Sequence, residues 1–305
     1  MKAALVVPRL TVDSAVNLTT IERMAADAVS LEGASFIRNN VMPSTLQEAY
    51  ELVKNNPILY DPIPETDLEL CYVYKQQIIT IYELPQFPAS EQPLYLIEEL
   101  YTPFQDFWRG FGYRDPDQFA ARFVEAINEA EDDIEQLIEH PGFQMAFQVN
   151  FEQVFAEVAQ TVAKLSGKRP KGRWFLEFGE GGDLGGFGRS NMFANLLNID
   201  RHTDIDIGYL RFILPHEMQH QIIDEAHPDE PWTLLRCIMV EGFCCFFNYL
   251  HWDRAYSPAR NIDFTEEEWS WCIAHEQEIY QAAKPHMDST DQAIIWSAPL
   301  NETVS

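Results

Sequence analysis

The residues that most constrain this chain lie at positions 213 to 222, which read ILPHEMQHQI. His216 and His220 are four residues apart, so on a helix both imidazoles project from one face about one turn apart. The apolar runs YLRFIL before them and II after them predict a segment buried in the body of the protein. Buried imidazole nitrogens need partners. The segment is therefore either a packed helix with hydrogen-bonded histidines or a helix that binds a metal ion.

The spacing suits a catalytic zinc site. Two imidazoles one helical turn apart can both reach one tetrahedral zinc ion at about 2.0 Å. Glu217 follows the first histidine, and its carboxylate would stand near the metal without binding it, where it could take a proton from metal-bound water. Because proline is tolerated only in the first turn of a helix, Pro215 predicts that this helix begins near Ile213 or Leu214 unless it is kinked.

A catalytic zinc of this type needs a third protein ligand, and Glu241 is the candidate. The segment DEPWTLLRCIMVEGFCCFFNYLHW predicts a second helix with Pro231 in its first turn. Glu241 falls on an otherwise apolar stripe of that helix, where a buried anion is costly unless a cation neutralises it. It lies far enough after His220 for the first helix to end and an antiparallel helix to return. An ion pair with Arg236 or Arg254 is the alternative.

The two segments HEMQH and TLLRCIMVEGFCCFF together resemble the gluzincin metallopeptidases, and within them the bacterial zinc-dependent proteases of the peptidase-MA-like group. The resemblance covers Trp174–Trp252, about a quarter of the chain. It implies that His216, His220 and Glu241 bind one Zn²⁺ per chain and that Glu217 is the catalytic base. It also implies a zincin-like α+β core, in which a small sheet with an edge strand accompanies the histidine helix and the glutamate helix.

The same resemblance assigns the substrate to the edge strand of that sheet, in ANLLNI. The residues concerned are Asn195, Leu196, Leu197 and Asn198. An extended peptide would pair with the backbone of such an open edge.

Peptide hydrolysis passes through a tetrahedral oxyanion, which needs a further hydrogen-bond donor. Six residues remain open for this role: Tyr209, Tyr249, His251, Tyr256, His275 and Tyr280. The other histidines near the motif, His202 and His227, are interpreted as loop residues. Cys244 and Cys245 are interpreted as small apolar residues of the second helix, with a thiolate ligand as the alternative for Cys245, which lies one turn beyond Glu241.

The remainder of the chain predicts three further parts around the metal-binding catalytic domain at 171–290. Residues 1–33 predict a strand and a helix that form an appendage, and in KAALVVPRL and NLTTIERMAADAVSLEGA they weakly resemble the opening of the nitrilase-type amidohydrolases. Residues 34–170 predict a mixed, mainly helical region, and residues 291–305 a tail.

Several local patterns predict individual elements. The segment LCYVYKQQIITIYEL predicts one or two strands. The segment WFLEF predicts a strand that leads through a long hairpin loop, GEGGDLGGFG, into a returning strand in NMFANLLNID. Prolines and glycines break the helical pattern of residues 94–166 near Pro103, Pro116 and Pro141. Thr265 and Glu268 have the spacing of a capping box at the start of the helix TEEEWSWCIAHEQEIYQAAK.

The formal net charge of -27 excludes several classes of partner. A phosphate backbone needs a basic footprint, so we expect no nucleic-acid partner, and an anionic membrane surface is disfavoured for the same reason. No apolar run approaches the roughly 18 residues of a membrane span. The five cysteines include an adjacent pair and no CxxC spacing, which favours reduced thiols in the cytoplasm.

The leading hypothesis is a cytoplasmic zinc metallopeptidase that acts on a peptide or protein. The alternative is a peptide- or protein-binding module that keeps its metal only for structure. A structural zinc is closed by four protein ligands, whereas a catalytic zinc keeps an open position. A third hypothesis, a nitrilase-type amidohydrolase, depends on the first thirty or so residues alone.

Overall fold

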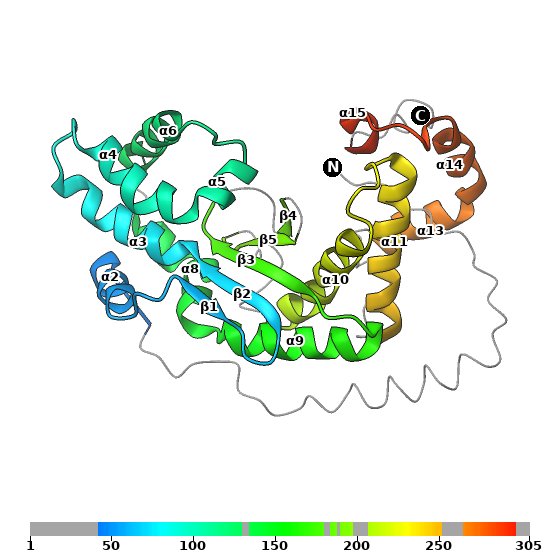
Figure 1. Cartoon of the computed structure of the whole chain (residues 1–305), viewed down its shortest axis with the longest axis horizontal. Coiled ribbons are helices and arrows are strands. Elements are labelled where there is room, and N and C mark those ends of the chain that lie inside the picture. The colour runs from blue at the N-terminus through cyan, green and yellow to red at the C-terminus, as the bar shows by residue number, and fades with distance from the viewer. Residues whose placement is uncertain are drawn as a thin grey trace. The chain divides into compact units, whose positions relative to one another are not determined.

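The computed structural model describes residues 42–129, 134–179, 184–187, 190–197, 207–251 and 265–296, and Figure 1 draws their helices and strands. These residues fall into two compact units, one within Ser35–Arg211 and one within Phe212–Ser305. Both contain helices and the first also contains a five-stranded sheet, so the predicted α+β class is confirmed. The predicted appendage, residues 1–33, lies outside the described residues. The two segments that resemble the nitrilase-type amidohydrolases belong to this appendage and are therefore not described either.

The sheet of the first unit has three parallel strands at its centre and one antiparallel strand at each edge. In spatial order the strands are β1 (Tyr60–Pro62), β2 (Asp67–Tyr72), β3 (Lys171–Glu177), β5 (Asn191–Asn195) and β4 (Leu184–Gly186). Strand β2 comes from the predicted helical region and β3 from the predicted catalytic domain, yet they pair over the length of β2. The structure therefore has no boundary between residues 170 and 171, because one sheet crosses that point.

The prediction of an edge strand at residues 195–198 is wrong for the described part of this segment. Asn195 ends β5, which pairs with β3 on one side and with β4 on the other. Leu196 and Leu197 follow the strand, and the Leu196 N–H donates to the Glu177 carbonyl at 2.9 Å. Asn198 lies outside the described residues. The chain crosses from β3 to the edge as β4 and returns as β5 between them, so β5 is parallel to β3 and not its hairpin partner.

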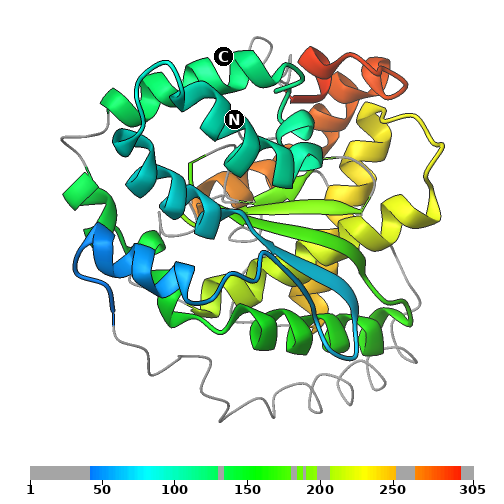
Figure 2. The ribbon, with the colours of Figure 1, turned by 60° about the vertical axis from the view of Figure 1, so that its left-hand side comes forward.

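Helices cover both faces of this sheet. Successive residues of a strand point to opposite faces. Trp174 of β3 contacts Phe155 of α9 (Phe151–Ser166) with ring centroids 4.9 Å apart, and Phe175 stacks on Phe107 of α5 (Gln105–Gly110) at 5.2 Å. Figure 2 shows α9 along one side of the strands and the helices from α3 (Val73–Glu83) to α6 (Pro116–Glu129) on the other. Burial on both faces explains the unbroken apolar run in β3, because alternation is expected only where one face is solvated.

The helical region predicted before β3 is confirmed, with breaks at the expected prolines. The helices are α2 (Leu46–Lys54), α3 (Val73–Glu83), α4 (Gln92–Leu96), α5 (Gln105–Gly110), α6 (Pro116–Glu129), α7 (Ile134–Glu139), α8 (Pro141–Gln148) and α9 (Phe151–Ser166), with a π-helical turn at Ile97–Tyr101 and 3₁₀ turns at Leu84–Gln86 and Thr102–Phe104. Of the segment LCYVYKQQIITIYEL, predicted as one or two strands, only residues 70–72 lie in a strand, the end of β2. Nearly all the rest is α3, which is buried on nearly all sides, and periodicity cannot distinguish such a helix from a strand.

The second unit is helical within the described residues. Its elements are α10 (Ile207–Ala226), which begins just before the unit, α11 (Leu234–His251), α13 (Glu266–Ala274), α14 (Glu276–Ala283), a 3₁₀ turn at Lys284–His286 and α15 (Gln292–Trp296). The helix of the two histidines does not begin near Ile213, as predicted, but runs on through Pro215. Its proline thus lies inside the helix, where it removes one backbone hydrogen bond.

The other helical ends depend on local caps. Helix α11 begins after Thr233, whose hydroxyl accepts a hydrogen bond from the Arg236 N–H at 3.2 Å, so Pro231 precedes the helix and does not lie in its first turn. The capping box of Thr265 and Glu268 is confirmed, although the predicted single helix is divided into α13 and α14. The predicted tail begins with α15, whose Ile295 is buried.

Candidate metal centre

Helix α10 brings the two imidazoles of the HExxH segment together. The Nε2 atoms of His216 and His220 are 3.1 Å apart, and His216 is 6% exposed. This proximity follows directly from their spacing of four residues on one helix. Two ring nitrogens at this distance share a proton or face a common cation, because two bare lone pairs would repel each other.

Glu241 of α11 completes a triangle with the two histidines. Its Oε2 atom lies 3.3 Å from His216 Nε2 and 3.4 Å from His220 Nε2. Ligand atoms about 2.0 to 2.1 Å from a tetrahedral zinc ion are separated by about 3.3 to 3.4 Å. The two distances to Glu241 therefore match those between ligands of one zinc ion, and the distance between the two histidine nitrogens, 3.1 Å, is slightly shorter.

The electrostatics of the triangle favour positive charge at its centre. Burial alone would lower the pKa of His216, but hydrogen bonds to Cys245 and Glu241 raise that pKa to about 10. Burial opposes the charge of His220 too, and the nearby Cys244 and Glu241 raise its pKa well above the ordinary value. Burial would raise the pKa of Glu241, but both histidines lower it. An excess proton or a metal ion satisfies all three groups.

The alternative ion pair of Glu241 with an arginine is not formed by Arg236. The Arg236 guanidinium lies 3.3 Å from Asp224 Oδ1 and donates to the carbonyl oxygen of His227 at 3.0 Å. The other candidate, Arg254, lies outside the described residues. Among the described groups, the two histidines are thus the cationic partners of Glu241.

Glu217 is partly buried on α10, beside the first histidine. Its negative charge helps to raise the pKa of the Cys244 thiol, although burial contributes most to that shift. No hydrogen bond or ion pair joins Glu217 to another described residue. Its carboxylate is therefore available to accept a proton from a group bound at the triangle.

Two thiols of α11 lie against the histidines, whereas the sequence interpretation treated both as small apolar residues and left a ligand role open for Cys245 alone. Cys245 Sγ lies 3.7 Å from Nδ1 of His216, the ring nitrogen that faces away from the triangle. The metal-ligating atoms of Cys244, His216 and His220 all lie within 4.8 Å of one another. The signal in the sequence was the position of Cys244 three residues after Glu241, a spacing that places two residues on one face of a helix.

The predicted oxyanion donors that the structure describes lie elsewhere. His275 donates from Nδ1 to the Trp271 carbonyl at 2.8 Å and stacks on the Trp271 ring. Tyr280 is 43% exposed, and its ring faces Lys284. Neither contacts the triangle. The remaining candidates fall outside the described side chains: Tyr209, Tyr249, His251 and Tyr256.

Of the two histidines predicted to lie in loops, His227 takes no part in the triangle. His227 pairs with Glu230, with 2.8 Å between Nδ1 and Oε1, and is exposed. His202 lies outside the described residues.

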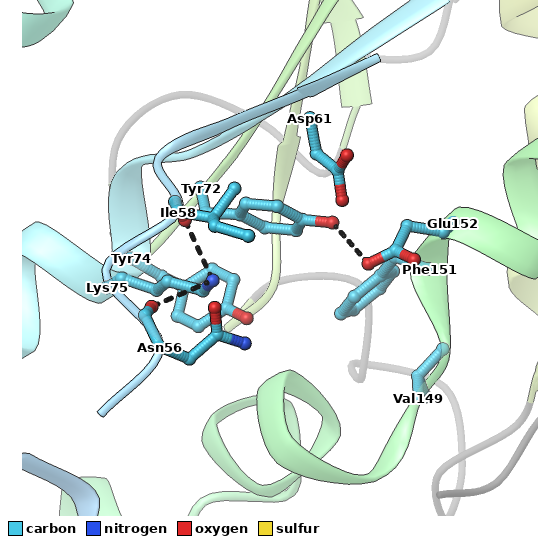
Figure 3. A pocket seen from close by; sticks show the side chains of 9 residues that line it. All are labelled: Asn56, Ile58, Asp61, Tyr72, Tyr74, Lys75, Val149, Phe151 and Glu152. Carbon is cyan, nitrogen blue, oxygen red and sulfur yellow. Dashed lines mark hydrogen bonds between the residues drawn. The ribbon is translucent and has the colours of Figure 1, made fainter. Parts of the chain in front are cut away.

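A separate polar cavity of about 40 Å³ lies in the first unit, between β1, β2, α3 and the start of α9 (Figure 3). The buried Lys75 donates to the carbonyl oxygens of Ile58 at 2.8 Å and Asn56 at 3.4 Å, and Tyr72 donates to Glu152 at 3.0 Å. This volume admits a few water molecules at most. Lys75 joins the loop before β1 to helix α3, and this contact supports a structural role for the cavity.

No family model, curated protein or solved structure matches this chain. Among the described residues, no helix is both long enough and apolar enough to cross a membrane. The side chains of α10 and α11 are therefore the features that bear on function.

Proposed function

We propose that this chain is a zinc-dependent hydrolase that cleaves peptide bonds, with His216, His220 and Glu241 as the ligands of one zinc ion. The observation that supports this proposal is the triangle of two imidazole nitrogens and one carboxylate oxygen, 3.1 to 3.4 Å apart. A bound zinc ion would supply Lewis acidity, which acidifies water and polarises a carbonyl group.

The protein's own part in the reaction falls to Glu217 and the groups around the histidines. Glu217 accepts a proton from the attacking water and passes it to the leaving amine, which is the role of a general base and then of a general acid. Cys245 contacts the second nitrogen of His216 and helps to fix the orientation of that ring. Burial of the site within the second unit limits the access of bulk water, which strengthens these electrostatic interactions.

The substrate class follows from charge and compartment. A chain with a formal net charge of -27 repels polyanions, so we propose a peptide or protein substrate. All five cysteines are buried thiols without a disulfide, which supports action in a reducing compartment such as the cytoplasm.

The proposal is tested by replacing the base while the ligands are kept. The Glu217→Gln variant should bind zinc as the wild type does but lose nearly all hydrolysis of a peptide library, by a factor of about 100 or more. A matched control is Glu230→Gln, which changes an exposed glutamate outside the triangle. Full hydrolytic activity in zinc-loaded Glu217→Gln would refute the proposed mechanism.

One observation favours a second candidate, a peptide-binding module with a structural zinc. Cys244 adds a fourth metal-ligating side chain close to the two histidines. Four protein ligands are the mark of a closed structural site. Glu217 would then have no bound water to activate, and the wild type would bind peptides without cleaving them.

A further inference from the structure

The side chains around the triangle include one more metal-ligating group than the proposed catalytic site needs. Cys244 lies on α11 one turn after Glu241, and its thiol is fully buried. Its sulfur and one ligating nitrogen from each of His216 and His220 all lie within 4.8 Å of one another. These three side chains could therefore hold one metal ion between them.

We infer that Cys244 is a fourth protein ligand of the metal and closes the coordination shell formed by His216, His220 and Glu241. This inference rests on the proposed metal site. Thiolate sulfur is a preferred ligand of zinc, and two imidazoles, one carboxylate and one thiolate form a complete tetrahedral set. The thiol proton is released to solvent as the sulfur binds, so no oxidant or reductant takes part.

The position of Cys244 gives this fourth ligand a regulatory consequence. The fourth position that Cys244 would fill is the one that the proposed mechanism leaves open for water. A thiolate in the fourth position excludes water from it, and the hydrolase is then held in a closed form. Release of Cys244 from the metal opens the position next to Glu217.

Cobalt(II) titration of the metal-free full-length chain tests the assignment without relying on activity. Cobalt bound by a thiolate has a sulfur-to-metal charge-transfer absorption in the near ultraviolet, in addition to the visible bands of a tetrahedral ion. We expect both in the wild type, loss of the charge-transfer absorption alone in Cys244→Ser, and its retention in Cys245→Ser. Cys245 is the matched control because its sulfur faces Nδ1 of His216, away from the triangle.

X-ray absorption on the zinc-loaded wild type gives the same answer without any substitution, should Cys244→Ser fail to fold. We expect one sulfur at about 2.3 Å beside nitrogen and oxygen at about 2.0 Å. A shell of nitrogen and oxygen alone, or visible cobalt bands without charge transfer, would overturn the role of Cys244.

Peptide hydrolysis separates this inference from the proposed function. If the bound thiolate holds the hydrolase in its closed form, the Cys244→Ser variant should cleave peptides faster than the wild type at equal zinc content. If sulfur is bound and neither protein cleaves peptides, Cys244 stands as a ligand and the hydrolase proposal fails. If the wild type cleaves peptides and its zinc has no sulfur ligand, the hydrolase stands and the role of Cys244 fails.

Discussion

At the scale of single residues, Glu241 decides whether α10 and α11 hold a metal. Its carboxylate is the only acidic group among the described residues within 3.4 Å of both ligand histidines. We expect the wild type, purified without added metal, to contain about one equivalent of zinc per chain, and Glu241→Ala to lose most of it. Elemental analysis checks this, with Glu230→Ala as a matched control. Equal zinc in both proteins would remove Glu241 from the site, and a wild type that binds none after zinc addition would leave α10 a packed helix.

A second residue, Glu83 at the end of α3, determines part of the acid stability of the first unit. Burial would raise the pKa of its carboxyl, but hydrogen bonds from Tyr50, Tyr95 and Lys54 lower it below the ordinary value of 4.5. As the pH falls below about 4.5, the Glu83 carboxyl is protonated in the unfolded chain before it is protonated in the folded protein. The stabilisation that the ionised carboxylate contributes is therefore lost as the pH falls further. At higher pH, Glu83 is ionised in both states and its contribution is fully present.

We expect Glu83→Gln to lower the free energy of unfolding near neutral pH by about 1 kcal/mol and to flatten its fall as the pH drops below about 4.5. Urea unfolding followed by circular dichroism measures both effects. Glu91→Gln is the control, since Glu91 is an exposed glutamate nearby. Parallel pH profiles of the wild type and Glu83→Gln would contradict the assignment.

At the scale of elements, Gly172 allows β3 to approach β5 closely. Its φ of +125° lies in a region that side chains disfavour, and an added Cβ would overlap the carbonyl oxygen of Ser190. Gly167, which ends α9 at φ +71°, has open space around it and serves as the control. We expect Gly167→Ala to lower the free energy of unfolding by about 1 kcal/mol and Gly172→Ala to lower it by more than about 2 kcal/mol, both measured by urea unfolding. If both variants lowered it equally, the contact between the added Cβ and the Ser190 carbonyl would not be destabilising.

At the scale of the whole molecule, the division into two units predicts a local response to metal. The proposed ligands lie on α10 and α11, whereas the sheet and α9 belong to the other unit. A ligand that binds only the folded state stabilises the region that must open to release it. Zinc should therefore slow amide hydrogen exchange in α10 and α11 at least about tenfold and leave β3 and α9 nearly unchanged. In Glu241→Ala, zinc should not slow exchange in α10 and α11, and uniform protection of the wild type across both units would contradict this separation.

How far the sequence could predict the site is clear from the helix α11. Its exposed face carries Leu235, Met239, Phe243 and Phe246, and its buried face carries Cys237, Val240, Cys244 and Phe247. A helix that is apolar on nearly all sides has no periodicity that shows which face is buried. Glu241 was identified because a charge is conspicuous in such a helix, whereas Cys244 was interpreted as one apolar residue among many.

The sequence by itself determined the features that depend on neighbours within about one helical turn. These are the histidine pair of α10, the capping box at Thr265 and the apolar segments that become β3 and β5. Only the tertiary structure decided which strand forms the edge of the sheet, that β2 pairs across the predicted domain boundary, and that a thiol of α11 lies beside the histidines. The physical reason is that strand order and helix rotation depend on contacts between distant segments, which local periodicity does not encode.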